Sequence, residues 1–312
     1  MLAVIFPGQG SQTLGMIKDF FENFPTVRNI FEKIKASTDI DVYNIIFEDS
    51  EKKLNITEFT QICIYTASIS IFMVIKEIYG EKFLNKIKFV AGHSLGEYTA
   101  LSASDTVSLL DCAKLLKLRG KYMQDSYPEN LSGMLAVIGL NINSIENILS
   151  DEKEKNLFEI ANHNGLNQVV LSLKKEDFNS VSSKLKEHGA KKTVPLNVSA
   201  GFHSSFMKKA SENMIKEIDK LVFNNSKYPI ISNYSANPVQ DSIDIMNNLK
   251  KQMLNQVKWV DTIKFLENNN VENILEIGPN NVLNGLNKRI SNKFILTNVS
   301  NIQELEDLKN VL

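Results

Sequence analysis

Short apolar runs alternate with longer segments of helical periodicity at both ends of this chain. A strand buried on both faces is a continuous apolar run, whereas a helix repeats its apolar positions every three or four residues. The predicted strands are Ala3–Phe6, Phe89–Ala91, Ile230–Ser232, Ile274–Ile277 and Phe294–Leu296. Strands that alternate with helices in this way predict an α/β fold with a mostly parallel sheet.

The pattern changes between Ser132 and Leu196. Here we predict strand Leu135–Ile138, a helix near Ile145–Leu149, strands Leu157–Ala161 and Gln168–Leu173, helix Glu176–His188 and strand Thr193–Leu196. This β-α-β-β-α-β order is typical of the ferredoxin-like unit. We therefore expect a discontinuous large domain, residues 1–127 and 198–312, interrupted by a small subdomain, residues 128–197. A cleft between the two is the expected ligand site.

A short glycine-flanked segment, Gly92-His93-Ser94-Leu95-Gly96, lies between a predicted buried strand, 88–91, and a predicted helix, 95–103. It matches the G-x-S-x-G elbow in its strand–turn–helix context. The glycines permit the tight turn that exposes the serine hydroxyl, and the helix N-terminus favours developing negative charge. Ser94 is therefore the predicted nucleophile, and the alternative is a structural Gly-Ser turn.

A serine nucleophile needs a base, and the chain has four histidines. His93 adjoins Ser94 on the tight turn and should point away from its hydroxyl. His188 ends a charged helix, and His163 lies in a predicted hairpin loop. His203 comes where the chain returns from the insert, beside the expected cleft, and is the predicted base. The alternative is a structural histidine at a helix start.

One arginine occupies an unexpected position in the helix predicted from Ser108, its N-cap, to Met123. At about 100° per residue, one face carries Cys112, Leu115, Leu116 and Met123. Arg119 falls at the centre of this apolar face, opposite Lys114, Lys117 and Lys121. An inward guanidinium is costly unless it meets an acid. Arg119 therefore either pairs with an internal carboxylate or binds an anionic substrate.

The loop after the first strand, Pro7–Gln12, contains two glycines but no phosphate-binding pattern. Neither the P-loop spacing nor the dinucleotide-binding spacing is met, which argues against nucleotide hydrolysis and dinucleotide binding. The loop is either a simple turn or the source of a backbone N–H for an oxyanion hole, beside the N–H of Leu95.

Composition restricts the partners. A formal net charge of −1, with no basic arm, argues against nucleic acid and against anionic membranes. The N-terminal apolar run, Leu2–Phe6, is too short for a signal peptide or a membrane span, so we expect a cytoplasmic protein. Cys63 and Cys112 are expected to be reduced and buried, and no metal-ligand spacing is found among the Cys and His residues.

Five motifs in order resemble the malonyl-CoA:acyl carrier protein transacylases, an acyltransferase family of fatty acid and polyketide synthesis. They are F-P-G-Q-G-S-Q at 6–12, G-H-S-L-G-E-Y at 92–98, L-R-G at 118–120, F-H-S at 202–204 and E-I-G-P at 276–279. The resemblance implies transfer of malonyl from malonyl-CoA to the phosphopantetheine thiol of an acyl carrier protein. It also implies an α/β-hydrolase-like core with an inserted ferredoxin-like subdomain, and neither a cofactor nor a metal.

The resemblance further implies the roles of single residues. Ser94 would be the nucleophile, His203 its base, and Arg119 the partner of the malonyl carboxylate. The other implied site residues contribute main-chain groups or line the pocket: the oxyanion-hole N–H groups of Gln9 and Leu95, the side chain of Gln61, and the main-chain carbonyl of Gln252, which would orient the histidine.

Other functions match part of the pattern. A stand-alone acyltransferase of a polyketide synthase would share this chemistry, and a serine thioesterase or esterase would share the elbow. The inward Arg119 and the F-H-S motif argue against the hydrolase, and the full set of catalytic positions argues against a non-catalytic binding module. We expect a monomer. A group of lysines is either a basic rim for an acidic carrier protein or ordinary solvated surface: Lys184, Lys186, Lys191 and Lys192.

Overall fold

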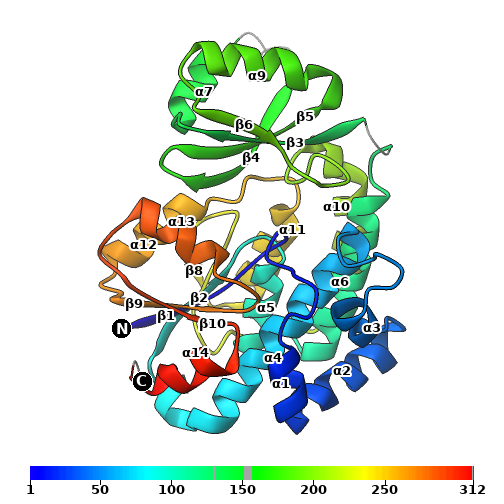
Figure 1. Cartoon of the computed structure of the whole chain (residues 1–312), viewed down its shortest axis with the longest axis vertical. Helices are drawn as coiled ribbons and strands as arrows, with labels where there is room; N and C mark the ends of the chain where they lie inside the picture. Colours follow the sequence, from blue (N-terminus) through cyan, green and yellow to red (C-terminus); the bar gives the residue numbers. More distant parts are fainter. Residues whose placement is uncertain (129–130, 151–156, 311) are drawn as a thin grey trace.

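The computed structural model describes residues 1–128, 131–150, 157–310 and 312, and it contains two sheets (Figure 1). The large sheet has the strand order β10-β9-β1-β2-β7-β8. Its strands are β1 Leu2–Phe6, β2 Ile87–Gly92, β7 Ile230–Ile231, β8 Pro238–Val239, β9 Asn273–Ile277 and β10 Ile295–Val299. All neighbouring pairs are parallel except β7 and β8. The predicted parallel sheet is thus confirmed, with five strands where the apolar runs indicated.

The strand that the sequence did not indicate is β8, which pairs antiparallel with β7 at the sheet edge. It is two residues long and begins with Pro238, which has no N–H to donate. Proline is tolerated at such an edge, and the polar residues Asn237 and Gln240 flank the strand, so no apolar run indicates it.

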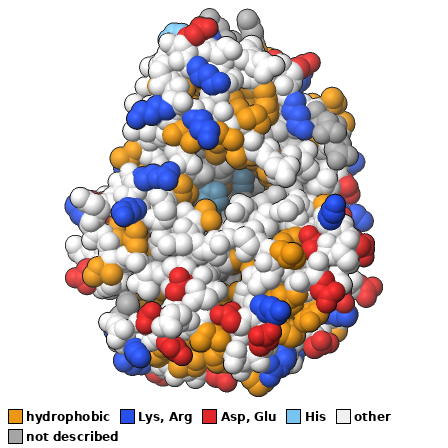
Figure 2. Space-filling model, viewed as in Figure 1, with side chains coloured by type: hydrophobic (Ala, Val, Ile, Leu, Met, Phe, Trp, Pro, Cys, Tyr) orange, Lys and Arg blue, Asp and Glu red, His pale blue; other side chains and the backbone are white. Residues whose placement is uncertain are grey.

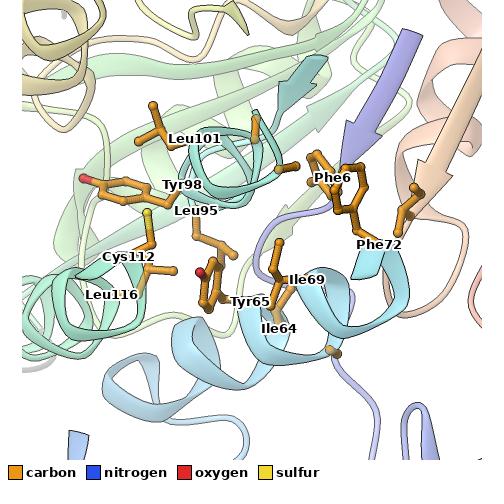
Figure 3. Packing of buried hydrophobic residues seen from close by; sticks show 14 of the residues in the cluster. Phe6, Ile64, Tyr65, Ile69, Phe72, Leu95, Tyr98, Leu101, Cys112 and Leu116 are labelled. Carbon is orange, nitrogen blue, oxygen red and sulfur yellow. The ribbon is translucent and has the colours of Figure 1, made fainter. Parts of the chain in front are cut away.

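Helices cover both faces of the large sheet, because alternate side chains of each strand point to opposite sides. Ala3 and Ile5 pack with residues of α12 (Trp259–Asn268) and α13 (Val282–Ile290). Leu2, Val4 and Phe6 pack into the larger core on the other face. That core is formed mainly by α4 (Thr57–Leu84), α5 (Gly96–Ala103) and α6 (Leu109–Gln124), and Figure 3 shows side chains of these helices packed together around Leu95.

The helix α4 is the centre of this core. By length and composition alone it could cross a membrane, since an 18-residue window has a mean hydropathy of 1.5. However, 72% of that window is buried among the surrounding elements, as in a core helix. Its apolar residues therefore stabilise the packing of α2 (Pro25–Thr38), α5 and α6 against it. Cys63 on α4 and Cys112 on α6 are free and buried, as predicted.

The small sheet has the order β4-β5-β3-β6, with every pair antiparallel. Its elements are β3 Ser132–Ile138, α7 Ile142–Ile148, β4 Phe158–Gly165, β5 Gln168–Lys174, η1 Lys175–Asp177, α9 Phe178–Glu187 and β6 Lys192–Pro195. The predicted β-α-β-β-α-β order is confirmed among the described residues. We call residues 132–195 the inserted segment and the rest the main body. Residues 129–130 and 151–156 of the expected subdomain lie outside the described residues.

One face of the small sheet packs under α7 and α9, and the other turns toward the main body (Figure 1). Met134, Ala136 and Val170 on that second face join the core of the main body. The prediction that His163 lies in a hairpin loop is wrong. His163 belongs to β4, which extends to Gly165 because His163 pairs with Val169 and Gly165 with Gln168 of β5. The backbone N–H of His163 is bonded to the carbonyl of Val257.

The remaining helices complete the main body. They are α1 Lys18–Asn23, α3 Val42–Phe47, η2 Ser205–Met207, α10 Lys208–Ile218, α11 Ser242–Gln252, α14 Ile302–Asp307 and η3 Leu308–Asn310. Of these, α10 follows directly on the return from the inserted segment and packs against α6 and α11.

Glu276 shows how the E-I-G-P segment supports the fold. It is fully buried on β9, and its carboxylate accepts hydrogen bonds from the N–H groups of Val282, Leu283 and Asn284, at 3.1, 2.9 and 2.7 Å. These are N-terminal N–H groups of α13 that have no partner within the helix. The carboxylate therefore joins the large sheet to the helix that covers it.

We expect Glu276→Ala to lower the free energy of unfolding by about 2 to 4 kcal/mol, because it leaves buried N–H donors without an acceptor. Urea unfolding followed by circular dichroism measures this change. Glu276→Gln is the matched control, since it retains one acceptor oxygen and should lose less. Equal stability of Glu276→Ala and the unaltered protein would contradict this role for the carboxylate.

Candidate active site

The elbow between β2 and α5 has the conformation that its sequence predicts, but for a partly different reason. The left-handed backbone lies at Ser94, with φ of 54°, rather than at a glycine. The glycines are required by close packing instead. A Cβ on Gly92 would lie 2.0 Å from the backbone of Gly96, and a Cβ on Gly96 would lie 2.2 Å from the carbonyl oxygen of Phe6. Strand, turn and helix therefore approach closely enough to hold Ser94 in a strained conformation.

The Ser94 hydroxyl and the His203 imidazole are directly bonded. Ser94 Oγ lies 2.7 Å from His203 Nε2, and His203 Nδ1 lies 3.1 Å from the main-chain oxygen of Gln252. Since a carbonyl oxygen only accepts, Nδ1 carries the proton, and Nε2 is left with a lone pair facing the hydroxyl. This arrangement can take a proton from Ser94 without a carboxylate behind the histidine.

The loop that carries His203 is held by the inserted segment. The Ser172 hydroxyl on β5 donates to the carbonyl of Phe202, and the Ser132 hydroxyl on β3 accepts from the N–H of Gly201. Glu159 on β4 accepts from the N–H of Ser205 at 2.9 Å. Residues on both sides of the histidine are thus fixed by strands of the small sheet, although the histidine itself belongs to the main body.

Arg119 lies beside this pair, and its side chain is only 1% exposed. Its Nη1 donates to Gln61 Oε1 at 2.6 Å, and its Nη2 donates to Gln252 Oε1 at 3.0 Å and to Ser94 Oγ at 3.1 Å. Its guanidinium carbon also lies 5.3 Å from the centre of the Tyr98 ring. Among the described residues its hydrogen-bond partners are neutral oxygens. Of the two alternatives for Arg119, the structure therefore does not support a direct pair with an internal carboxylate.

These groups surround a cavity of about 120 Å³ between the main body and the inserted segment. Figure 2 shows the opening, with histidine at the bottom of a hollow. The main body contributes Gln9, Gln61, Ser94, Leu95, Arg119 and His203 to its wall, and the inserted segment contributes Met134, Asn162, Asn164 and Val170. The expected cleft is thus present. Gln252 stands behind the wall and contacts both Arg119 and His203.

The backbone N–H groups of Gln9 and Leu95 have no acceptor in the part of the chain that the structure describes. Both residues line the cavity, and Leu95 directly precedes the first residue of α5. Two unengaged N–H groups beside a serine hydroxyl are the usual components of a site for a negatively charged oxygen.

The other histidines have different surroundings. His93 Nε2 lies 2.7 Å from Asn164 Oδ1, so His93 is bonded away from the Ser94 hydroxyl while its ring still lines the cavity. His188 ends α9 and is exposed, and its Nδ1 lies close to the carbonyl of Lys184 in its own helix. The described residues contain no group of three or more His, Cys, Asp or Glu side chains that could hold a metal ion.

Two residues behind the elbow, Glu97 and Asn233, were not predicted from the sequence as part of the site. Glu97 is 4% exposed, and its carboxylate accepts from Gln252 Nε2 at 2.7 Å and from the N–H of Asn233 at 3.3 Å. Asn233 Oδ1 in turn accepts from the N–H of Ser94 at 2.7 Å. Burial raises the pKa of Glu97 to about 7, against the opposing effect of these hydrogen bonds.

The sequence contains a weak indication that each of these two residues belongs to the site. Glu97 belongs to the heptapeptide 92–98, and Asn233 is a polar residue just beyond the carboxyl end of a predicted strand, where ligand sites of parallel sheets lie. Neither signal indicates which atoms the side chain contacts.

Comparison with known proteins agrees with this geometry. The family model for the acyl transferase domain matches residues 4–291. The malonyl CoA-acyl carrier protein transacylase of Staphylococcus aureus (strain MSSA476) is 35% identical, covering 98% of this chain and 97% of that protein. The corresponding transacylase of Salmonella typhimurium is 34% identical and covers 92% of each.

Two solved structures are similar over nearly the whole chain. An acyl-carrier-protein-S-malonyltransferase from Bartonella henselae has a TM-score of 0.95 at 36% identity, covering 99% of this chain and 98% of the other. A malonyl-transacylase bound to a type II polyketide synthase acyl-carrier protein has a TM-score of 0.94 at 33% identity, covering 99% of both.

The pKa of His203 is shifted strongly. Burial, followed by the positive charge of Arg119, lowers it to about 3, whereas histidine ordinarily titrates near pH 6.5. Between about pH 3 and 6.5 the unfolded chain therefore binds a proton that the folded chain does not. The stability that His203 contributes is complete above pH 6.5 and is lost as the pH falls toward 3.

We expect the His203 imidazole to remain neutral well below pH 6 in the folded protein, as read from its ring-nitrogen chemical shifts in an NMR titration. Arg119→Ala should raise this pKa by removing the neighbouring positive charge, although burial still keeps it below 6.5. A His203 titration near pH 6.5 in the unaltered protein would contradict the prediction.

Proposed function

This chain belongs to the acyl transferase domain family, and we propose that it transfers malonyl from malonyl-CoA to the phosphopantetheine thiol of acyl carrier protein, supplying fatty acid synthesis. The observation that carries the proposal is the buried guanidinium of Arg119, 3.1 Å from the Ser94 hydroxyl and without a direct carboxylate partner among the described residues. An acyl donor that also carries a free carboxylate suits both the Ser94 hydroxyl and the unpaired positive charge. Its carbonyl carbon is attacked by Ser94, and its carboxylate pairs with Arg119.

The first half-reaction forms a malonyl-serine. His203 Nε2 takes the proton of Ser94 as Oγ attacks the thioester carbon of malonyl-CoA. The carbonyl oxygen becomes an oxyanion, for which the N–H groups of Gln9 and Leu95 are the proposed donors. The bond from carbon to sulfur then breaks, and the coenzyme A sulfur leaves with the proton held by His203.

The second half-reaction uses the same groups in reverse. The thiol of the carrier's phosphopantetheine arm enters the cavity, and His203 takes its proton as sulfur attacks the malonyl ester. The ester bond breaks, and Ser94 Oγ recovers the proton from His203. In this mechanism the Gln252 carbonyl keeps the histidine in the required tautomer throughout, and no bound cofactor takes part.

A neighbouring hollow supports the entry of a phosphate-bearing arm. It shares Asn164 with the active-site cavity and is lined by Lys191 and Arg289. Two cations in this adjoining hollow suit the phosphate groups of coenzyme A and of the carrier's phosphopantetheine arm.

We further infer that the fold is an α/β-hydrolase-like core, residues 1–127 and 198–312, with a ferredoxin-like subdomain, residues 128–197, inserted into it. The parallel strands of the large sheet and the β-α-β-β-α-β order of the inserted segment support this division. The proposed location is the cytoplasm, since malonyl-CoA and acyl carrier protein are charged, water-soluble substrates.

A second candidate is the same transfer in polyketide synthesis. The similar transacylase bound to a type II polyketide carrier protein supports it. The two candidates share every chemical step and differ in the carrier. Relative kcat/KM with a fatty acid carrier protein and with a polyketide carrier protein therefore distinguishes them.

We expect malonyl-CoA alone to leave a malonyl group on Ser94, because the first half-reaction needs no acceptor. Intact-mass analysis should show one malonyl adduct, which disappears when carrier protein is added. Ser94→Ala should form none. An adduct of equal yield in Ser94→Ala would place the nucleophile elsewhere, and an adduct released to water as fast as to the carrier would indicate a hydrolase.

We expect Arg119→Ala to change the preferred substrate. A bidentate pair of charge-assisted hydrogen bonds at about 1.5 to 3 kcal/mol each corresponds to a loss of roughly 10² to 10⁴ in kcat/KM for malonyl-CoA. Acetyl-CoA has no carboxylate, so its transfer should hold or rise. Arg119→Lys should recover part of the malonyl activity, since it restores charge without the planar fork. Equal losses for both substrates in a folded variant would contradict the assignment.

A further inference from the structure

We propose that Glu97 is a positioning residue that orients the side-chain amide of Gln252 and, through it, the guanidinium of Arg119. The inference rests on the proposed function, because it explains how the malonyl-binding arginine is held ready. Glu97 does not line the cavity and makes no hydrogen bond to Arg119. Its effect on the substrate would pass through one amide group.

The Gln252 side-chain amide is held in a defined orientation by three hydrogen bonds. Its Nε2 donates to Glu97 Oε2 at 2.7 Å and to the main-chain oxygen of Ser94 at 2.9 Å. Both partners of Nε2 are acceptors, so Oε1 is left facing Arg119 Nη2 at 3.0 Å. The main-chain oxygen of the same residue faces His203 Nδ1. Gln252 therefore contacts the nucleophile's backbone, the base and the arginine.

The hydrogen bond to Glu97 makes it unfavourable for the Gln252 amide to exchange the positions of its Oε1 and Nε2. An ionised carboxylate can only accept hydrogen bonds, and a bond that it accepts is stronger than one to a neutral carbonyl. If the amide flipped, Gln252 Oε1 would face the carboxylate and Nε2 would face the Arg119 donor, so both contacts would be lost in a buried site. With a neutral amide at position 97, which can donate as well as accept, the flip would be opposed only by the carbonyl of Ser94 and the Arg119 donor.

The placement of Glu97 also explains why Arg119 is free to bind an anion. A carboxylate in direct contact with the guanidinium would offset its charge and compete with the substrate for the same N–H groups. Glu97 instead lies one amide away, where its charge still offsets part of the cost of burying Arg119. The guanidinium keeps neutral direct partners in Gln61, Gln252 and Ser94.

Glu97 also accepts a hydrogen bond from Asn233, and the test must separate the effect of this contact from the effect of the contact with Gln252. Glu97 Oε1 accepts from the N–H of Asn233, and Asn233 Oδ1 accepts from the N–H of Ser94. Loss of the contact with Asn233 would disturb Ser94 and slow the transfer of every acyl group equally. Loss of the contact with Gln252 would disturb Arg119 and therefore slow malonyl transfer selectively. The ratio of kcat/KM for malonyl-CoA to kcat/KM for acetyl-CoA isolates the effect that passes through Gln252 and Arg119.

The experiment measures this ratio at pH 8 in the unaltered protein, Glu97→Gln, Arg119→Ala and the double variant. We expect Glu97→Gln to lower the ratio about tenfold or more, and to have no further effect on the ratio once Arg119 is removed. Glu276→Gln is the matched control, because it changes a buried carboxyl group that does not line the cavity, and it should leave the ratio unchanged. Thermal melts confirm that each variant is folded at the assay temperature.

The outcomes separate the two levels of proposal. If the unaltered protein transferred no malonyl, the proposed function would be overturned and this inference with it. If it transferred malonyl but folded Glu97→Gln had an unchanged ratio, or lowered the ratio as much without Arg119 as with it, this inference alone would be overturned. Should Glu97→Gln fail to fold, Gln252→Met removes the amide and keeps the carbonyl that faces His203. It should lower the ratio in the same way, and an unchanged ratio would again overturn the inference.

Discussion

The Arg119 guanidinium carries a permanent positive charge into the interior, and the arrangement of its neighbours follows from that charge. It is held by amide and hydroxyl oxygens of Gln61, Gln252 and Ser94 and by the face of Tyr98. Neutral partners satisfy its hydrogen bonds without cancelling its charge. Burial, followed by the positive charge of Arg119, lowers the pKa of the neighbouring His203 imidazole, and a neutral imidazole is the form that accepts a proton. In the proposed mechanism the same cation therefore serves both substrate recognition and the protonation state of the base.

The site needs both sheets. The main body carries Ser94, Arg119 and His203, but the loop of His203 is fixed by hydroxyl and carboxylate groups on the strands of the inserted segment. The cavity is closed by Met134, Asn162, Asn164 and Val170 of that segment. Ser94 and His203 both have left-handed backbone conformations, with φ of 54° and 53°. Such conformations persist only where the surrounding packing imposes them. Here the main body and the inserted segment both contribute to that packing.

Much of this protein follows from local sequence patterns. The parallel sheet, the β-α-β-β-α-β insert and the helix that begins after the Ser108 cap were predicted from apolar periodicity and capping, because those patterns act over a few neighbouring residues. The elbow at Ser94, the choice of His203 and the inward face of Arg119 were likewise predicted. Periodicity failed for the two-residue β8 and for His163, a polar residue that belongs to a strand because it pairs with Val169 of β5.

The sequence by itself thus indicated which side chains are candidates for the chemistry and on which elements they stand. Only the tertiary structure decided that Arg119 meets amide and hydroxyl oxygens rather than a carboxylate, and that Glu97 anchors the Gln252 amide. The main-chain oxygen of Gln252 lies 3.1 Å from His203 Nδ1, a contact that the family resemblance implied. Periodicity indicates the face on which a side chain lies, but a hydrogen bond depends on atomic positions set by packing. Glu97 and Gln252 are separated by more than 150 residues in the chain, and only the folding of α5 against the end of α11 brings them together.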